Sequence, residues 1–458
     1  MDPSPLLALR VLWRQRQLER GCGMSSRELA AHQLQQIENV RQFAYKNSPF
    51  YARFHRGLER APLDQLPPLP KGVMMENFDD LVTDRTLRLS EAEEFLRSTT
   101  RPAMFRGKYV ALATSGSTGR RGVFLFNTRE WITALANITR PIKWAGMQPN
   151  PLKPHRYAFI ASTAPWHYSA RVSHSLSSGL LPSLKIDAGT PIDLMVKQLN
   201  EWQPETMAAY PSVLRQLADE QVAGRLHISL RAVATSAETL TAETRRKAQQ
   251  AWTTQVYDTY GASEYAPIAA ECQYGNRHLV EDAAFIEVAD EKGRAVPAGE
   301  DGERVLITVF HRFTQPLIRY EISDLVRRKA GTCGCGRPFQ MIEAIEGRKE
   351  DILHFPGTAK RDVAIHPNVF DGVLERVPAS AWQITQDGDV LIISLAGLRQ
   401  PDAEASIASA MSKCLQEEGA QLPRIEVLRV ESLERGLSGK APLIRCKRAW
   451  IAQPEVGT

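Results

Sequence analysis

The chain has 458 residues, of which 43% are apolar and 24% are charged. This composition predicts a large core and more than one domain, and it excludes a chain that is mainly disordered. The 57 Lys and Arg residues exceed the 52 Asp and Glu residues by little, so the net charge of +5 indicates no nucleic-acid surface but is compatible with a small anionic ligand.

The N-terminal apolar run at residues 5–9 is followed closely by Arg10, Arg14, Arg16 and Arg20. It is too short and too charged for a signal peptide or a membrane span, and no other stretch reaches spanning length. Six cysteines in a chain of this length, without an export signal, indicate reduced thiols or metal ligands rather than disulfides. We therefore expect a cytoplasmic protein that binds neither membranes nor nucleic acid.

The first hundred residues have mainly helical patterns. Residues 25–51 repeat apolar side chains about every 3.6 residues, with Ser26 as a candidate cap and Pro49 as the stop. A proline-rich connector at 66–70 leads to a short helical patch at 78–82. We expect a helical accessory layer to which we assign no chemistry.

A loop rich in Ser, Thr and Gly at residues 114–119 lies between two apolar runs, 110–113 and 123–126, that predict strands. Its glycines allow the backbone to approach a ligand closely, so that N–H groups and hydroxyls can converge on phosphate oxygens. Because it joins strand to strand and lacks a Gly-Lys-Ser/Thr ending, it is not a Walker loop. Taken alone, it is equally typical of a flexible surface hairpin.

The segment that follows alternates between predicted helices (129–145, 191–202 and 211–223) and predicted strands (156–161, 206–210 and 230–235), and residues 256–264 read as a further strand that runs into a turn. This alternation favours an α/β fold. Ligands of such sheets gather beyond the carboxyl ends of the strands, which makes residues 236–238 and 258–264 site candidates. There, Tyr260 can stack on a flat ring and Glu264 can hold a cation. The alternative is a core tyrosine and a solvated glutamate.

Six motifs, in this order, resemble those of the adenylate-forming ligases, and most resemble the phenylacetate-CoA ligase branch. They are the loop at 114–119, Ala237-Glu238, Tyr260 to Glu264, Arg319 to Asp324, Gly347-Arg348 and Ser438-Gly439-Lys440. The resemblance begins at residues 47–51 and covers nearly the whole chain. It implies an α/β protein with a large layered adenylation domain of mixed sheets and helices at residues 1–346. A small mobile α+β domain at 347–458 would carry the catalytic lysine.

The resemblance also implies the roles of individual residues. The triphosphate of ATP would bind to Thr114, Ser115, Gly116, Ser117, Thr118 and Gly119. The rest of the nucleotide would bind to Ser236, Ala237, Glu238, Asp258, Thr259, Tyr260, Gly261, Asp324 and Arg348. Asp324 would accept hydrogen bonds from the ribose hydroxyls, with a salt bridge to Arg319 or Arg327 as the alternative. Glu264 would bind Mg²⁺, and Lys440 would be the catalytic cation rather than a solvated lysine.

The acid would lie against residues that are either pocket walls or core. These are Trp166, His167, Tyr168, Tyr210 and Ala262. Their aromatic character and the branch resemblance make an aromatic acid the first expectation.

Two cysteines separated by one glycine, Cys333 and Cys335, can grip one metal ion, and Cys272 with His278 supplies a second pair. Some relatives carry such a zinc. A closed Cys₃His set would be structural rather than catalytic. The alternative is a group of unligated residues with reduced thiols.

Residues 347–351 are expected to form the hinge, with Glu350 as the residue whose backbone turns. A hairpin at 382–393, a helix at 403–418 and a strand at 424–430 are predicted beyond it. The stretch 354–362 lacks the Gly-Val-rich turn that CoA-using relatives carry, which leaves the acceptor open.

We therefore expect an enzyme that activates a carboxylic acid with MgATP to an acyl adenylate and passes the acyl group to a thiol, first of all CoA. An acyl carrier protein, an amine or no acceptor is the alternative, and a homodimer is left open. A non-catalytic nucleotide-binding protein on a ligase fold is the alternative of another class. The joint presence of Glu264, Asp324, Arg348 and Lys440 argues against it.

Overall fold

The computed structural model describes residues 1–114, 121–145, 154–178, 181–357, 362–436 and 439–450. The chain begins with a helical layer, as the sequence predicts, made of α1 (Pro5–Glu19), α2 (Ser26–Asn47), α3 (Pro49–Phe54), α4 (Lys71–Glu76), α5 (Phe78–Leu81) and α6 (Leu89–Ser98). The cap of α2 is Ser25 rather than Ser26: its hydroxyl accepts from the Glu28 N–H, and the Glu28 carboxylate accepts from the Ser25 N–H. Ser48, after the last residue of α2, caps α3, which starts at Pro49.

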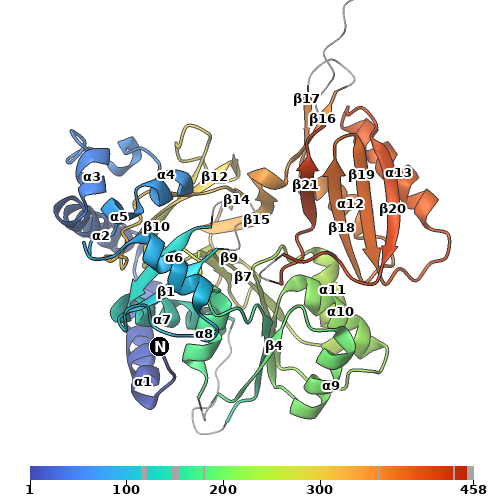
Figure 1. The fold of residues 1–458 in the computed structure, drawn as a ribbon, viewed down its shortest axis with the longest axis horizontal. Helices are drawn as coiled ribbons and strands as arrows, with labels where there is room; N and C mark the ends of the chain where they lie inside the picture. The colour runs from blue at the N-terminus through green and yellow to red at the C-terminus, as the bar shows by residue number, and fades with distance from the viewer. Residues whose placement is uncertain (115–120, 146–153, 179–180, 358–361, 437–438, 451–458) are drawn as a thin grey trace, which may run out of the picture.

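The main sheet has ten strands, and half of it is parallel. The parallel strands are β3 (Tyr157–Ala161), β4 (Ser183–Asp187), β5 (Thr206–Ala209), β6 (Ala232–Ser236) and β7 (Val256–Tyr260), in the spatial order β4-β3-β5-β6-β7. The helices α7 (Thr128–Trp144), α8 (Tyr168–Leu176), α9 (Ile192–Trp202), α10 (Pro211–Val222) and α11 (Ala242–Trp252) alternate with them (Figure 1). Since β3 pairs with β4 on one side and with β5 on the other, the strand order reverses at β3.

The sheet continues beyond β7 through antiparallel strands. These are β8 (Ala269–Glu271), β9 (Arg277–Leu279), β15 (Met341–Arg348), β14 (Asp324–Lys329) and β11 (Asp301–Gly302). A second sheet contains β10 (Ala284–Ala289), β12 (Arg304–Val309) and β13 (Tyr320–Ile322), and a hairpin pairs β1 (Tyr109–Ala113) with β2 (Val123–Asn127). The residues that flank the 114–119 loop are therefore strands, as predicted, whereas residues 115–120 lie outside the described part of the chain.

A smaller unit with its own apolar core follows the short 3₁₀ turn Lys349–Asp351. It holds β16 (Leu353–Pro356), β17 (Asp362–Ile365), α12 (Pro367–Leu374), α13 (Glu404–Glu417) and a four-stranded sheet of β18 (Ala381–Asp387), β19 (Val390–Ala396), β20 (Arg424–Val430) and β21 (Ile444–Arg448). This C-terminal unit stands above α10 and α11 at the end of the molecule away from α1 (Figure 1). The mixed α/β class and the α+β character of the last hundred residues agree with the sequence prediction.

Candidate active site

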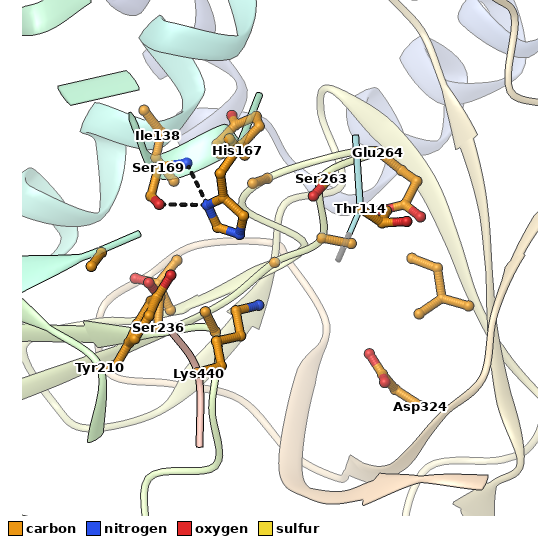
Figure 2. Close-up of a pocket in the computed structure, with 18 of the residues that line it drawn as sticks. Thr114, Ile138, His167, Ser169, Tyr210, Ser236, Ser263, Glu264, Asp324 and Lys440 are labelled. Carbon is orange, nitrogen blue, oxygen red and sulfur yellow. Dashed lines mark hydrogen bonds between the residues drawn. The ribbon is translucent and has the colours of Figure 1, made fainter. Parts of the chain in front are cut away.

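A cavity of about 340 Å³ opens at the carboxyl ends of β3, β5, β6 and β7, next to the point where the strand order reverses. Open α/β sheets bind ligands at this place, because the loops there diverge and leave a crevice. Lys440 of the small C-terminal unit completes its wall. Figure 2 shows the Lys440 amine pointing into the space between His167 and Asp324. The cavity thus lies between the two units of the chain.

One end of the cavity carries groups that can bind an anion. The Thr114 hydroxyl, at the start of the Ser/Thr/Gly loop, accepts a hydrogen bond from the Gly122 N–H (2.8 Å) and one from Lys71 Nζ (3.1 Å). Lys71 begins α4 and lines the cavity, so the N-terminal layer does contribute a charged group to the site. Nothing near it in the sequence signals this, because Lys71 stands in a proline-rich connector 43 residues before Thr114.

The opposite wall carries a carboxylate held by two donors. The Tyr260 hydroxyl donates to Asp324 Oδ2 at 2.6 Å, and Arg348 Nε lies 3.3 Å from Asp324 Oδ1. Burial and the negative charge of Asp324 raise the pKa of Tyr260 well above its ordinary value, so the phenol stays a donor. Asp324 is only 7% exposed and still lines the cavity. It is therefore a fixed acceptor for hydroxyl groups.

Glu264 lines the same cavity, and its carboxylate is held by one neighbour. The Tyr320 hydroxyl donates to Glu264 Oε1 at 3.0 Å, while Arg312 donates to the backbone carbonyl of Glu264 at 3.3 Å. The side chain is 8% exposed. A nearly buried carboxylate that opens onto a cavity fits the oxygen ligation preferred by Mg²⁺, which usually keeps several waters and few protein ligands.

Lys440 enters the cavity from the C-terminal unit. Its ammonium lies 6.0 Å from the ring centroid of Tyr210, within the range of a cation–π contact. Burial, together with repulsion from Arg348, lowers the pKa of Lys440 to about 8. Lys440 is thus a cation at neutral pH that has already lost much of its hydration.

Glu238 holds the backbone next to Lys440. Its Oε1 accepts from the Ala441 N–H and its Oε2 accepts from the Ser212 N–H, each at 2.9 Å. One carboxylate therefore ties the Lys440 segment to the first turn of α10. The neighbouring Ala237, which lines the cavity, adopts a φ of 75°, a left-handed conformation that is unfavourable for a residue other than glycine.

The half of the cavity on the β3 side is uncharged apart from Lys440 at its mouth. Its lining comprises Ile138, Phe159, Ile160, Ala161, His167, Tyr168, Ser169, Ala208, Ala209 and Tyr210. His167 Nδ1 accepts from the Ser169 N–H at 3.3 Å and lies 2.6 Å from the Ser169 hydroxyl (Figure 2). With Nδ1 as the acceptor, we assign the proton of the neutral ring to Nε2. Burial lowers the pKa of His167 to about 3, with the charge of Lys440 as a second cause. His167 is therefore a neutral hydrogen-bond donor.

Most, but not all, of the predicted site residues meet at this cavity. Thr114, Ser236, Ala237, Thr259, Gly261, Ala262, Glu264, Asp324, Arg348 and Lys440 line it. Asp258 does not, because its carboxylate accepts from the Thr235 hydroxyl (2.8 Å) and pairs with Arg277 (2.9 Å). Trp166 does not either, and its ring lies beside Arg121. Ser115, Gly116, Ser117, Thr118 and Gly119 fall outside the described residues, as does the side chain of Glu350.

The four predicted metal ligands form a second cluster, at the antiparallel side of the sheet. The ligand atoms of Cys272, His278, Cys333 and Cys335 all lie within 4.8 Å of one another. Cys272 Sγ is 3.7 Å from Cys333 Sγ, and Cys335 Sγ is 3.3 Å from His278 Nε2. Two sulfurs bound to one tetrahedral zinc at about 2.3 Å would be roughly 3.8 Å apart.

Comparisons with known proteins agree with this geometry. The AMP-binding enzyme family matches residues 109–308, which include the hairpin of the phosphate loop, the parallel strands and Glu264. Over these residues the chain is similar to AMP-binding enzymes. The resemblance to the adenylate-forming ligases is thereby confirmed.

Two curated relatives of this chain are a phenylacetate-coenzyme A ligase from Thermus thermophilus and Protein CapK from Staphylococcus aureus. The first is 24% identical over 361 residues, which cover 77% of this chain and 76% of the ligase. The second is 23% identical over 315 residues, which cover 64% of this chain and 62% of CapK. The match to CapK thus spans less than two thirds of that protein.

Solved structures share the fold over almost the whole chain. A 2-hydroxyisobutyryl-CoA ligase in the postadenylation state superposes with a TM-score of 0.75 at 19% identity, covering 94% of this chain and 92% of that one. The same ligase in the thioesterification state gives a TM-score of 0.60. The chain thus superposes better on the first of these two structures than on the second.

Proposed function

We propose that this protein activates a monocarboxylic acid with ATP and Mg²⁺ to an acyl adenylate and pyrophosphate, and then transfers the acyl group to CoA. The observation that carries this proposal is the meeting of Lys440 with Glu264, Asp324 and Arg348 in one cavity. These two carboxylates and two cations come from four separate segments of the chain. A non-catalytic nucleotide-binding protein would not require Lys440 at that position.

Each group has a distinct part in the first half-reaction. Asp324 accepts from the ribose hydroxyls, and Thr114 with Lys71 lies on the phosphate side. When bound, Mg²⁺ would be held by Glu264 and would neutralise phosphate charge. Lys440 would lie at the α-phosphate, where negative charge accumulates as the carboxylate oxygen attacks. Little covalent chemistry is required of the protein, because alignment and charge stabilisation lower the barrier.

The uncharged half of the cavity supports an acid with one carboxylate and an uncharged body. A second carboxylate buried there would be left without a cationic partner, which is costly. The His167 Nε2–H can donate to an oxygen of the acid. The apolar walls, Ile138 and Phe159 among them, fit an aromatic or branched body, and some relatives are named phenylacetate-coenzyme A ligase.

Pyrophosphate release measured over a panel of monocarboxylic acids, aromatic ones first, tests this proposal. Mass spectrometry should find the acyl adenylate without CoA and the acyl thioester once CoA is added. Thioester formation on an acyl carrier protein instead of CoA would reassign the acceptor. Nucleotide binding with no acid-dependent turnover over the panel would contradict the proposal.

Adenylation should depend on pH through Lys440. Because the pKa of Lys440 is lowered to about 8, the group is protonated below pH 8 and loses its charge above it. We expect kcat/KM for ATP to be level below pH 8 and to fall up to about tenfold per pH unit above it. Pyrophosphate release from pH 6 to 10 measures this. The Lys440→Arg variant, which stays charged, should lack the alkaline limb, and a wild-type profile that is level to pH 10 would contradict the assignment.

We propose that the Cys₃His cluster binds one structural zinc ion. His278 Nδ1 lies 3.3 Å from the Phe339 carbonyl and must donate to it, which leaves Nε2 free to bind a metal beside Cys335. The Asn276 amide donates to Cys333 Sγ at 3.2 Å and would stabilise a thiolate there. The ion would tie the β8–β9 hairpin to the loop between β14 and β15.

Elemental analysis should therefore find about one zinc per chain. Replacing Cys333 and Cys335 with serine should remove it and lower the melting temperature by on the order of 10 °C, because metal binding contributes to folding. The Cys446→Ser variant, at an exposed thiol outside the cluster, is the control and should keep the metal. Metal-free wild-type protein of undiminished stability would refute the site.

A further inference from the structure

The outer face of α1 gathers large apolar side chains in the solvent. Leu6, Leu9, Leu12 and Trp13 are 64%, 65%, 54% and 63% exposed. They are four of the ten large apolar residues that stand exposed in the described part of the chain, and the other six lie on other segments. Since Leu6, Leu9 and Trp13 are separated by three and four residues, they lie on one side of the helix.

The opposite side of α1 packs against the rest of the protein. Leu7, Val11, Gln15 and Leu18 are buried, and Arg14 Nε donates to the Thr133 hydroxyl of α7 at 3.2 Å. The outer face is therefore not needed to hold the helix in place. Apolar groups left in water side by side cost free energy and commonly mark a binding surface.

The exposed charges on this face of α1 are positive, and Asp2, which precedes the helix, is paired with His174 at 3.0 Å. Arg10, Arg16 and Arg20 are exposed beside the apolar side chains. The acidic residue of the helix, Glu19, is paired with Lys143 at 2.6 Å, and α1 has no acidic residue in its first turn. Long arginine side chains can rest on an apolar surface while their guanidinium groups reach phosphates.

We propose that the outer face of α1, defined by Leu6, Leu9, Leu12 and Trp13 with Arg10, Arg16 and Arg20, docks the protein on a membrane surface rich in anionic phospholipid. The apolar groups would enter the boundary between headgroups and acyl chains, where tryptophan is favoured, and the arginines would meet lipid phosphates. A second copy of the chain fits less well, because a two-fold contact through this face would bring the arginines together.

This docking differs from a membrane span. Among the described helices, none is long and apolar enough to cross a bilayer. The sequence expectation that the chain binds no membrane rested on the shortness of the apolar run, and it could not foresee that one side of α1 stays uncovered. Docking through α1 would leave the C-terminal unit, at the other end of the molecule, away from the lipid (Figure 1).

Co-sedimentation of the full chain with vesicles tests the proposal. We expect at least about tenfold stronger partitioning onto vesicles of equal parts phosphatidylcholine and phosphatidylglycerol than onto pure phosphatidylcholine, with binding weakened by salt. Leu9→Glu with Trp13→Glu should abolish binding, and Arg10→Ala with Arg16→Ala should weaken it about tenfold or more. Leu194→Glu, at an exposed leucine of α9, is the matched control and should bind like the wild type.

Because the replaced side chains are exposed, the variants should keep the wild-type melting temperature and pyrophosphate release, which separates docking from folding and catalysis. No binding of wild-type protein to anionic vesicles at low salt would overturn the proposal. Light scattering that shows a dimer, lost in the Leu9→Glu and Trp13→Glu variant, would also overturn it and assign the face to a contact between copies.

Discussion

Replacing Lys440 with alanine is expected to slow adenylate formation at least about a hundredfold, a loss of roughly 2.7 kcal/mol of transition-state stabilisation. ATP affinity should change only a few-fold. Lys440 lies in the cavity, and its lowered pKa marks a cation that has paid for desolvation before the substrate arrives. Such a cation stabilises charge that develops at the α-phosphate more than charge already present in the bound nucleotide.

Stopped-flow measurement of pyrophosphate release, with nucleotide binding measured separately, checks this expectation. The variant should still convert a supplied acyl adenylate, because that step does not build charge on the α-phosphate. Wild-type release rates in the Lys440→Ala variant, or an equal loss in both half-reactions, would exclude Lys440 as the catalytic cation.

Arg215→Ala should slow adenylate formation about tenfold to a hundredfold through the position of the C-terminal unit. The Arg215 side chain, 4% exposed on α10, donates to Glu375 Oε1 (3.1 Å) and to the Ala379 carbonyl (3.0 Å), and both partners belong to the C-terminal unit. Because Glu375 is 17% exposed and also accepts from Trp382 Nε1, loss of the two Arg215 hydrogen bonds should cost roughly 1.5–3 kcal/mol. The arrangement that keeps Lys440 in the cavity would then lose population.

Thioester formation from supplied acyl adenylate should be unaffected in the Arg215→Ala variant, since that step does not need Lys440 in the cavity. Small-angle scattering should show a less compact average shape, independent of any activity. Arg399→Ala is the matched control, because Arg399 is 62% exposed and 3.6 Å from Asp219. Equal slowing of both steps with unchanged scattering would show a structural role only.

The sequence predicts elements best where local chemistry decides them. Residues 424–430 form the predicted strand, and the predicted helix at 211–223 matches α10, because apolar periodicity and the proline at its start are local signals. Glu264, Asp324, Arg348 and Lys440 were singled out from motifs, and the structure brings these four side chains to one cavity.

Long-range contacts could not be predicted in this way. Lys71 reaches Thr114 only because α4 packs beside the β1–β2 hairpin, and Glu238 turns to the Ala441 and Ser212 backbones because the C-terminal unit closes over α10. Asp258 was assigned to the nucleotide through the family resemblance, yet Arg277 from a neighbouring antiparallel strand binds its carboxylate. The spacing of apolar residues in the sequence likewise does not show which side of α1 faces α7.

The exchange of labelled pyrophosphate into ATP tests the central claim most directly, since it reports reversible adenylate formation and needs no acceptor. The account predicts exchange by the wild type that requires both Mg²⁺ and a monocarboxylic acid, proceeds without CoA, and falls at least about a hundredfold in the Lys440→Ala variant. Folded wild-type protein that binds ATP but catalyses no acid-dependent exchange, or exchange that is unchanged without Lys440, would contradict it.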